Sequence, residues 1–382
     1  VSLTTWKQFR QRFKPLRFRR SFFLMSSLAT SSEQAVPARG PLRDGVWFMG
    51  AATVLLAAIV FGSSIGPAGP DWWRVPLELL NRLPLIDFDS GVSDGEWAIV
   101  WKIRMPRVVL GGLVGGMLSI AGAAYQGVFR NPLVDPYLLG AAAGAGLGAT
   151  IGLTIGRSAT SGWPVDPVPA IAFVFAVTTV MVTYAVGAAF GGSRTGVTLV
   201  LAGVAVVSFT SAIQAFILQR NLDVIREVTR WLLGSLTRSS WADVRLVLPY
   251  VAVSSLVLIM HRRHLDVFRV GDEEAATLGV SVPRTRLVIV VAATLGTAAV
   301  VSVSGLIGFV GLVVPHVIRL IAGAGHRRLL PLSMMGGAAF MILADVPGRM
   351  LTRPAETPIG IVTAFVGAPF FLYLLRTRRV GA

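Results

Sequence analysis

Hydrophobic residues occur along this chain in long runs separated by short polar segments. The runs lie near residues 46–66, 106–127, 137–156, 168–190, 197–218, 246–260, 287–303, 306–324, 329–346 and 358–375. A helix that crosses the hydrocarbon core of a bilayer needs about 20 predominantly apolar residues. The pattern therefore predicts an all-α membrane protein with about ten transmembrane helices, and an even number of spans places both chain ends on one side.

Glycine is frequent inside these runs, and proline interrupts some of them. Pro315 and Pro331 each fall within an apolar run, where the backbone groups that proline leaves unpaired need a neighbouring helix or a cavity. Small residues at a spacing of four let two helix backbones approach closely. A compact helix bundle is therefore predicted from Gly111, Gly112, Gly115, Gly116, Gly122, Gly140, Gly144, Gly146 and Gly148.

The composition narrows the class of protein further. Mean hydropathy is +0.69, and only 14% of the residues are charged, against about 25% in a soluble domain. This balance excludes an ordinary soluble enzyme. The chain has no cysteine, so disulfides, thiolate metal sites and cysteine nucleophiles are excluded as well.

Basic residues are concentrated in the first 45 positions, among Ser, Thr, Gln and Pro. They are Lys7, Arg10, Arg12, Lys14, Arg17, Arg19, Arg20, Arg39 and Arg43. We expect residues 1–45 to form a disordered cytoplasmic tail and residues 46–382 to form the membrane domain. Lys and Arg favour the cytoplasmic side, and the tail supplies this bias, so both termini are predicted there. The net charge of +16 fits basic loops beside anionic lipid better than nucleic-acid binding.

The sequence contains no catalytic constellation. A phosphate-cradling Gly-x-x-x-x-Gly-Lys-Ser/Thr string is absent, so the chain alone is not expected to hydrolyse nucleotide. His261 and His264 fit a solvated inner helix end better than a metal site, because carboxylate partners are lacking. His316 and Arg319 are expected to share a helix end near the inner surface.

Three further features could contact partners or the membrane surface. Residues 221–237 predict an amphipathic helix at the outer interface. Arg104, Arg107 and Arg349 lie at outer helix ends, where guanidinium groups could bind carboxylates or could anchor the helices in the interface. Residues 271–279 predict a short helix in an inner loop, which is either solvated or docked in the groove of a partner.

Longer strings carry a family resemblance. In chain order they are 104–107 (RMPR), 122–127 (GAAYQG), 130–140 (RNPLVDPYLLG), 201–204 (LAGV), 231–236 (WLLGSL), 308–316 (GFVGLVVPH), 344–349 (ADVPGR), 358–363 (PIGIVT) and 367–371 (GAPFF). Over about residues 98–379 the chain resembles the FecCD-type permeases of ATP-binding cassette (ABC) importers for iron siderophores, heme and cobalamin. The resemblance implies a type II ABC importer permease of ten helices, which pairs with a second copy or a close homologue.

The resemblance also assigns roles to residues of this chain. It implies that Arg104, Arg107 and Arg349 meet glutamates of an extracytoplasmic substrate-binding protein. It implies a coupling helix, received by an ATPase subunit, at Gly271, Asp272, Glu273, Glu274, Ala275, Leu278 and Gly279. The cytoplasmic gate is placed at Thr195, Gly196, Val197 and Thr198, although these residues depart from the family pattern. The basic tail and the pair Pro347-Gly348 before Arg349 are further departures.

The implied function is the passage of a metal chelate across the bacterial inner membrane by alternating access. Two ATPase subunits would bind ATP and Mg, and this chain would perform no bond chemistry and need no cofactor or metal. Ferric siderophore is the expected substrate, with heme or cobalamin as alternatives. A secondary transporter usually buries a carboxylate at mid-membrane, which no predicted span carries at its centre. A channel or passive scaffold would need no coupling helix.

Overall fold

The computed structural model describes residues 41–82, 90–159, 166–190, 196–352 and 355–379. These residues form helices and connecting turns, with no strand among them. The chain divides into two compact units, residues 1–45 and 46–382. The predicted tail lies almost entirely outside the described residues, and its cytoplasmic position stays a prediction.

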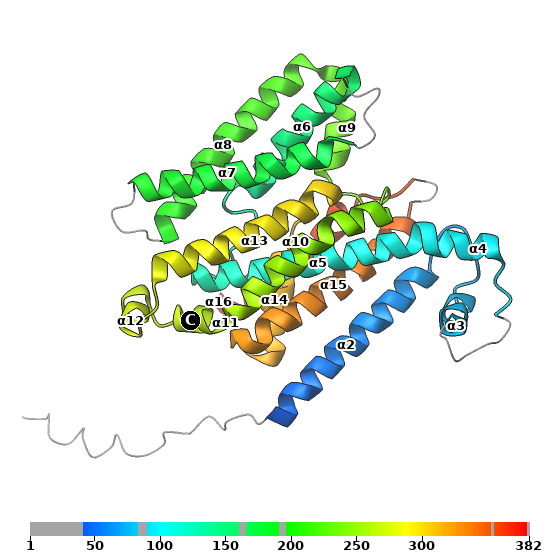
Figure 1. The fold of residues 1–382 in the computed structure, drawn as a ribbon, viewed down its shortest axis with the longest axis horizontal. Coiled ribbons are helices and arrows are strands. Elements are labelled where there is room, and N and C mark those ends of the chain that lie inside the picture. The colour runs from blue at the N-terminus through cyan, green and yellow to red at the C-terminus, as the bar shows by residue number, and fades with distance from the viewer. Residues whose placement is uncertain (1–40, 83–89, 160–165, 191–195, 353–354, 380–382) are drawn as a thin grey trace, which may run out of the picture. The chain divides into compact units, whose positions relative to one another are not determined.

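The helices follow one another with short connections (Figure 1). In chain order they are α2 (Pro41–Ser64), α3 (Arg74–Asn81), α4 (Asp94–Ile99), a π-helix (Val100–Arg104), α5 (Met105–Val128), α6 (Ala141–Ala159), α7 (Val168–Phe190), α8 (Gly196–Arg220), a 3-10 turn (Leu222–Val224), α9 (Ile225–Leu232), α10 (Trp241–Met260), α11 (Arg262–Val267), α12 (Asp272–Thr277), α13 (Val282–Ser304), α14 (Val310–Ala322), α15 (His326–Met350) and α16 (Ile359–Arg379).

Within the described residues, seven helical segments are long and apolar enough to cross a membrane. They are Asp44–Ser64, Asp94–Val128, Val168–Phe190, Thr198–Arg220, Trp241–Met260, Val282–Ser304 and His326–Met350. The shorter apolar helices Ala141–Ile155, Val310–Ala322 and Ile359–Tyr373 fall on the three remaining predicted runs. The all-α, multi-pass membrane fold is therefore confirmed, whereas a total of ten spans stays a prediction.

Helix α5 is the central helix of the bundle. It packs against α15, α13, α14 and α10, and nearly all of its side chains are buried (Figure 1). A Cβ added at Gly115 would lie 2.2 Å from the Gly337 carbonyl oxygen of α15, and one at Gly122 would lie 1.9 Å from the Gly311 carbonyl oxygen of α14. Because no side chain fits at these distances, glycine is what allows the backbones to approach. The compact packing predicted from glycine spacing is confirmed at these positions.

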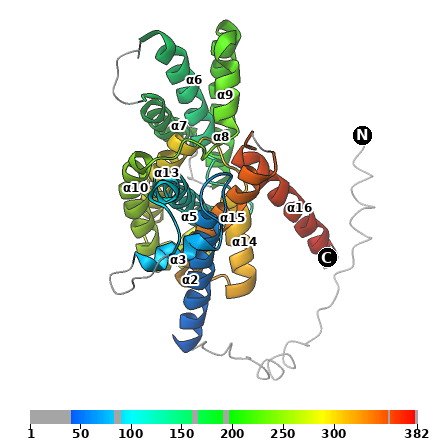
Figure 2. The same cartoon turned by 90° about the vertical axis from the view of Figure 1, so that its right-hand side faces the viewer.

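A second group of helices packs on α13. Helix α6 contacts α7 and α8, and α13 contacts both α7 and α5, so it joins this group to the central helix (Figure 1). Helix α16 contacts α15 and α14 and extends along the edge of the bundle (Figure 2). Large apolar side chains of α8 and α16 are exposed in the single chain, among them Leu201, Phe209, Phe365 and Leu372.

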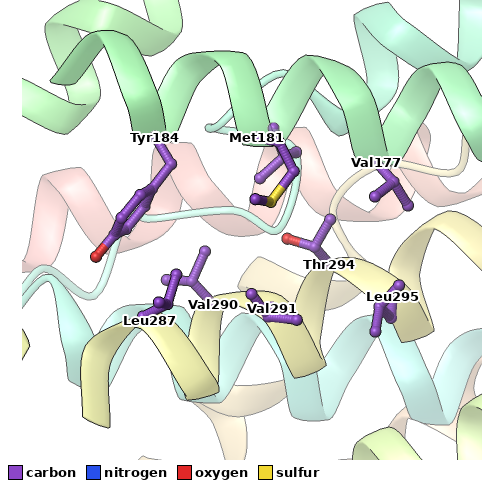
Figure 3. A pocket seen from close by; sticks show the side chains of 9 residues that line it. Val177, Met181, Tyr184, Leu287, Val290, Val291, Thr294 and Leu295 are labelled. Carbon is purple, nitrogen blue, oxygen red and sulfur yellow. The ribbon is translucent and has the colours of Figure 1, made fainter. Parts of the chain in front are cut away.

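A small apolar cavity lies between α7 and α13. Figure 3 shows Met181 and Tyr184 of α7 opposite Val290 and Thr294 of α13, with the other lining side chains all aliphatic. Its volume is about 20 Å³, enough for about one water molecule. The Thr294 hydroxyl lies 2.8 Å from the Tyr125 hydroxyl. The cavity is therefore a packing gap and is too small for a chelate.

Two details of the predicted helices need correction. Pro315 and Pro331 lie inside α14 and α15, and both helices continue through them, so these residues do not break the spans. The amphipathic helix expected over 221–237 is shorter, because a 3-10 turn precedes α9 and Gly234 ends it with a φ of 70°. Val228, on the buried face of α9, is 1% exposed, as expected for the apolar side of such a helix.

Candidate functional site

Two of the three predicted docking arginines bind the carboxyl-terminal end of α2. Arg104, the last residue of the π-helix before α5, donates from Nη1 to the Ser63 and Ser64 carbonyl oxygens at 3.1 and 2.7 Å. Arg349 donates to the Gly62 and Ile65 carbonyl oxygens at 2.9 and 3.0 Å. The last carbonyls of a helix have no partner within the helix. The two guanidinium groups supply these partners and complement the negative end of the helix dipole.

Arg107 is the centre of an ion-pair network. Its Nε and Nη2 donate to the two carboxylate oxygens of Asp345 at 2.8 Å each, and its Nη1 donates to Glu356 at 3.0 Å. Asp345 also lies 3.0 Å from Arg349 Nε, four residues later on α15. The hydroxyl of Thr237 donates to the second oxygen of Glu356 at 2.7 Å. One carboxylate therefore bridges two arginines, and the second joins the network to the 233–240 turn.

The contacts of Glu356 favour its ionised form. Burial raises the pKa of Glu356, but hydrogen bonds from Arg107 and Thr237 outweigh it and hold that pKa below its ordinary value. Arg107 and Arg349 balance the two carboxylates, and the guanidinium group of Arg104, bound to backbone carbonyls next to Arg349, adds one surplus positive charge. That surplus lies at the end of α5 and α15 that the sequence analysis places outside.

The three arginines do not present open guanidinium forks. Arg104, Arg107 and Arg349 are 4%, 8% and 3% exposed, and each is held by carbonyls or carboxylates of its own chain. A carboxylate of a binding protein would have to displace these contacts. The structure thus brings the three residues together, as predicted, but it assigns them internal partners. Direct docking stays a prediction.

Sequence reasoning missed two members of this network. Asp345 occurs in the sequence analysis only within the 344–349 string, and Glu356 is not singled out there. The spacing of Asp345 and Arg349 at i and i+4 is the usual spacing of a helical ion pair, and it could have indicated the first. Nothing local in the sequence pairs Glu356 with Arg107, since the two lie 249 positions apart.

The predicted coupling segment forms a short helix that protrudes from the bundle. Helix α12 lies between Gly271 and Gly279, which have φ values of 134° and 82°. Ala275 is fully buried against the core, whereas Leu278 is 67% exposed. Both carboxylates of Glu273 and Glu274 are on exposed residues. The segment therefore combines a buried anchor with an uncovered apolar and acidic surface, which suits a docking element.

Asp272, the first residue of α12, is held by arginines of neighbouring segments. Arg286 of α13 donates to it at 2.8 Å, and Arg130 lies 3.6 Å from its other oxygen. Arg286 is 3% exposed. The start of α12 is therefore fixed to the membrane domain, so a displacement of α12 would be transmitted to α13.

The predicted gate can be located only in part. Thr195 lies outside the described residues, and Gly196, Val197 and Thr198 begin α8. Their role as a gate stays a prediction.

His261 and His264 lie at a helix end, as predicted, whereas His316 lies in the middle of α14 and not at its end. That these residues face the inner side of the membrane stays a prediction. His261 and His264 lie at the junction of α10 and α11, with ring centroids 5.3 Å apart. His316 is buried inside α14, and Arg319 of the same helix donates to the Gln126 side chain at 2.7 Å. The last turn of α14 is thereby tied to the end of α5.

Comparisons with known proteins agree with this architecture. Residues 52–377 match the family model described as the FecCD transport family. A cobalamin import system permease protein of Halobacterium salinarum is 44% identical over 370 residues, which cover 89% of this chain and 98% of that protein. A hemin transport system permease protein of Yersinia pestis is 35% identical, and the match covers 76% of this chain and 87% of that protein. The Fe(3+) dicitrate transport system permease protein FecD of Escherichia coli is 33% identical, and the match covers 77% of this chain and 89% of that protein.

A solved structure supports the same assignment. It is described as an inward-facing conformation of a metal-chelate type ABC transporter, and it superposes with a TM-score of 0.72 at 28% identity. The match covers 87% of this chain and 99% of the other. With a family model spanning most of the sequence and relatives matched over most of their length, this chain belongs to the FecCD transport family of ABC transporter permeases.

Proposed function

We propose that this chain is the membrane-spanning subunit of an ATP-driven importer that carries a cobalamin-type metal chelate inward across the cytoplasmic membrane. The observation that carries the substrate class is the 44% identity, over 98% of its length, with a cobalamin permease. The hemin and ferric citrate permeases are 35% and 33% identical. Ferric siderophore, the substrate expected from the sequence, is the second candidate, supported by the iron permeases among the relatives.

The proposed assembly follows from what this chain lacks and what it exposes. Its sequence has no phosphate-cradling loop, so ATP and Mg belong on two separate ATPase subunits. A second copy or close homologue would cover the apolar faces of α8 and α16, and an extracytoplasmic binding protein would deliver the chelate. We place both termini in the cytoplasm, because Lys and Arg of the basic tail favour that side.

An uptake experiment tests the substrate. In a strain that lacks this gene and its paralogues, we expect the restored chain and its partner subunits to take up labelled cobalamin. Ferric siderophore and hemin are measured in parallel with the same cells. Uptake of ferric siderophore without cobalamin would overturn the first choice and favour the second. Uptake of none of the three would overturn the metal-chelate assignment.

The proposed mechanism transmits movement of the ATPase pair through α12. Ala275 anchors α12 in the core, and the Asp272–Arg286 ion pair joins its first turn to α13. Reversing charge at Glu273 and Glu274 should uncouple transport from hydrolysis without affecting insertion, because both residues are exposed. The matched control reverses Asp71 and Asp94, which are exposed acids of the segments before α5. Normal uptake in Glu273→Lys, Glu274→Lys would remove α12 from this role.

For the outer network we propose that Arg104, Arg107 and Arg349 shape a positively charged docking face. Their internal bonds hold the ends of α2, α5 and α15 together, and the surplus charge attracts acidic residues of the binding protein. A pulldown with the binding protein, repeated at rising salt, tests this role. Unchanged binding by a folded Arg107→Gln protein would limit the network to a structural function.

A further inference from the structure

A large basic pocket is lined by residues of α5, α14 and α15 and of the turns beside them. The transport mechanism proposed above assigns no role to this pocket. Its volume is about 510 Å³, within the range of about 300 to 1,000 Å³ typical of small-molecule sites. The lining residues come from the end of α5 and its following turn, the α11–α12 connection, α14 and the start of α15. They are Gln126, Gly127, Arg130, Pro132, Arg269, His316, Arg319, Leu320, Ala324 and His326.

The lining is strongly cationic. Arg130, Arg269 and Arg319 contribute three permanent charges, and two histidines contribute ring nitrogens. No Asp or Glu is among these lining residues. Two carboxylates contact lining residues: Asp266 lies 2.7 Å from His326, and Asp272 lies 3.6 Å from Arg130. Like charges that share a cavity repel one another, so an anion in the pocket would relieve the repulsion.

Local structure alone does not account for an arginine at position 130. Arg130 has a φ of 51° and lies in the left-handed turn that ends α5, where Asn131 N–H donates to the Gln126 carbonyl at 3.2 Å. Glycine is the usual residue at this position of such a turn, because a Cβ is strained there. The ion pair with Asp272 is long at 3.6 Å, and the Arg130 side chain is 46% exposed. Neither the turn nor this weak pair explains the guanidinium group.

Two of the other lining side chains, Arg319 and His326, are held in place by the fold. Arg319 is oriented by its 2.7 Å bond to Gln126. His326 is 3% exposed, and its Nδ1 and backbone N–H both contact Asp266. Gly127 leaves room for the imidazole, since a Cβ there would lie 2.7 Å from His326 Nε2. One side of the pocket is therefore built from oriented groups, Arg319 and His326, and the exposed Arg130 and Arg269 add cations to it.

We propose that this pocket binds a phosphoryl group, with Arg130, Arg269 and Arg319 as its contacting residues. Arginine suits this ligand because its planar guanidinium makes paired hydrogen bonds to phosphate oxygens. The group could belong to the headgroup of an anionic phospholipid, for which basic pockets between membrane helices are known sites, or to soluble phosphate. Carboxylate ligands are a poorer match, because they offer two oxygens to three guanidinium groups.

The test uses the full chain in nanodiscs and has two arms. In the lipid arm, native mass spectrometry counts the phosphatidylglycerol retained per chain from discs of phosphatidylcholine with increasing phosphatidylglycerol. In the soluble arm, radiolabelled inorganic phosphate is titrated against discs of phosphatidylcholine alone. We expect saturable binding in one arm, which identifies the source. Absence of saturable binding in both arms would overturn the proposal.

The variants separate the site from general surface charge. Arg130→Gly should bind about tenfold or more weakly, because it removes charge-assisted hydrogen bonds, yet it should be at least as stable as the wild type because it relieves the strained φ. Arg269→Gln, at an exposed residue, should weaken binding similarly. The matched control is Arg327→Gln, an exposed cation next to His326 that does not line the pocket. If all three variants bound phosphate or lipid as well as the wild type, the pocket would not be the binding site. If all three lost binding equally, general surface charge and not the pocket would be responsible.

Discussion

Replacement of Asp345 by Asn tests whether the ion-pair network around Arg107 stabilises the fold. Asp345 is 4% exposed and contacts Arg107 twice at 2.8 Å and Arg349 at 3.0 Å. Asn has nearly the same shape but no charge, so two buried guanidinium groups would lose their shared counter-ion. Removing one partner of a buried pair costs about 3 to 5 kcal/mol. Because Glu356 still pairs with Arg107, we expect a loss near the lower limit, about 3 kcal/mol.

The measurement is equilibrium unfolding in mixed micelles. Purified protein in a neutral detergent is titrated with sodium dodecyl sulfate, and the loss of helix is followed by circular dichroism. Asp71→Asn is the matched control, since its ion pair with Arg74 is 3.5 Å long and both side chains are accessible to solvent, at 35% and 63%. Exposed pairs contribute about 0 to 1 kcal/mol. If Asp345→Asn destabilised the protein no more than this control, the network would not be stabilising the fold.

Three further outcomes are expected from the same structure. Gly115→Ala should reduce folded yield sharply, because its Cβ would lie 2.2 Å from a backbone carbonyl of α15. Gly112→Ala is the control and should be tolerated, because its Cβ would lie 3.4 Å from the nearest neighbouring atom. Fluorescence-detected size-exclusion chromatography in detergent compares the folded yields of the two variants. The pKa of Glu356 is lower in the folded state than the value of about 4.3 expected in the unfolded chain, so its ionised form stabilises the fold above that pH. This stabilisation is lost as the pH falls through the folded-state pKa. The free energy of unfolding of Glu356→Gln should therefore depend less on pH than that of the wild type. Tyr137→Phe should cost about 1 to 3 kcal/mol in the same titrations, because the Tyr137 hydroxyl bonds both the Ile307 carbonyl and N–H at 3.1 and 3.2 Å; an unchanged midpoint would contradict that role.

The sequence by itself determined the class of fold and the position of each main helix. All ten apolar runs fall on helices, and α12 was placed within two residues at each end. The physical reason is that a bilayer leaves no water for backbone hydrogen bonds, so an apolar run of sufficient length must form a helix. The glycines at positions 115 and 122 also indicated close packing, although the sequence did not show which helices they face.

Only the tertiary structure decided which helices are neighbours and which charges are paired. Lipid chains are as apolar as leucine, so a lipid-facing surface and a helix-packing surface have similar hydropathy. The Arg107–Asp345 contact joins residues 238 positions apart, and the basic pocket gathers residues from four separate segments. Local pattern could therefore place Arg104, Arg107 and Arg349 at the ends of helices. It could not show that α2 and two carboxylates hold them, because those partners become adjacent only when the bundle packs.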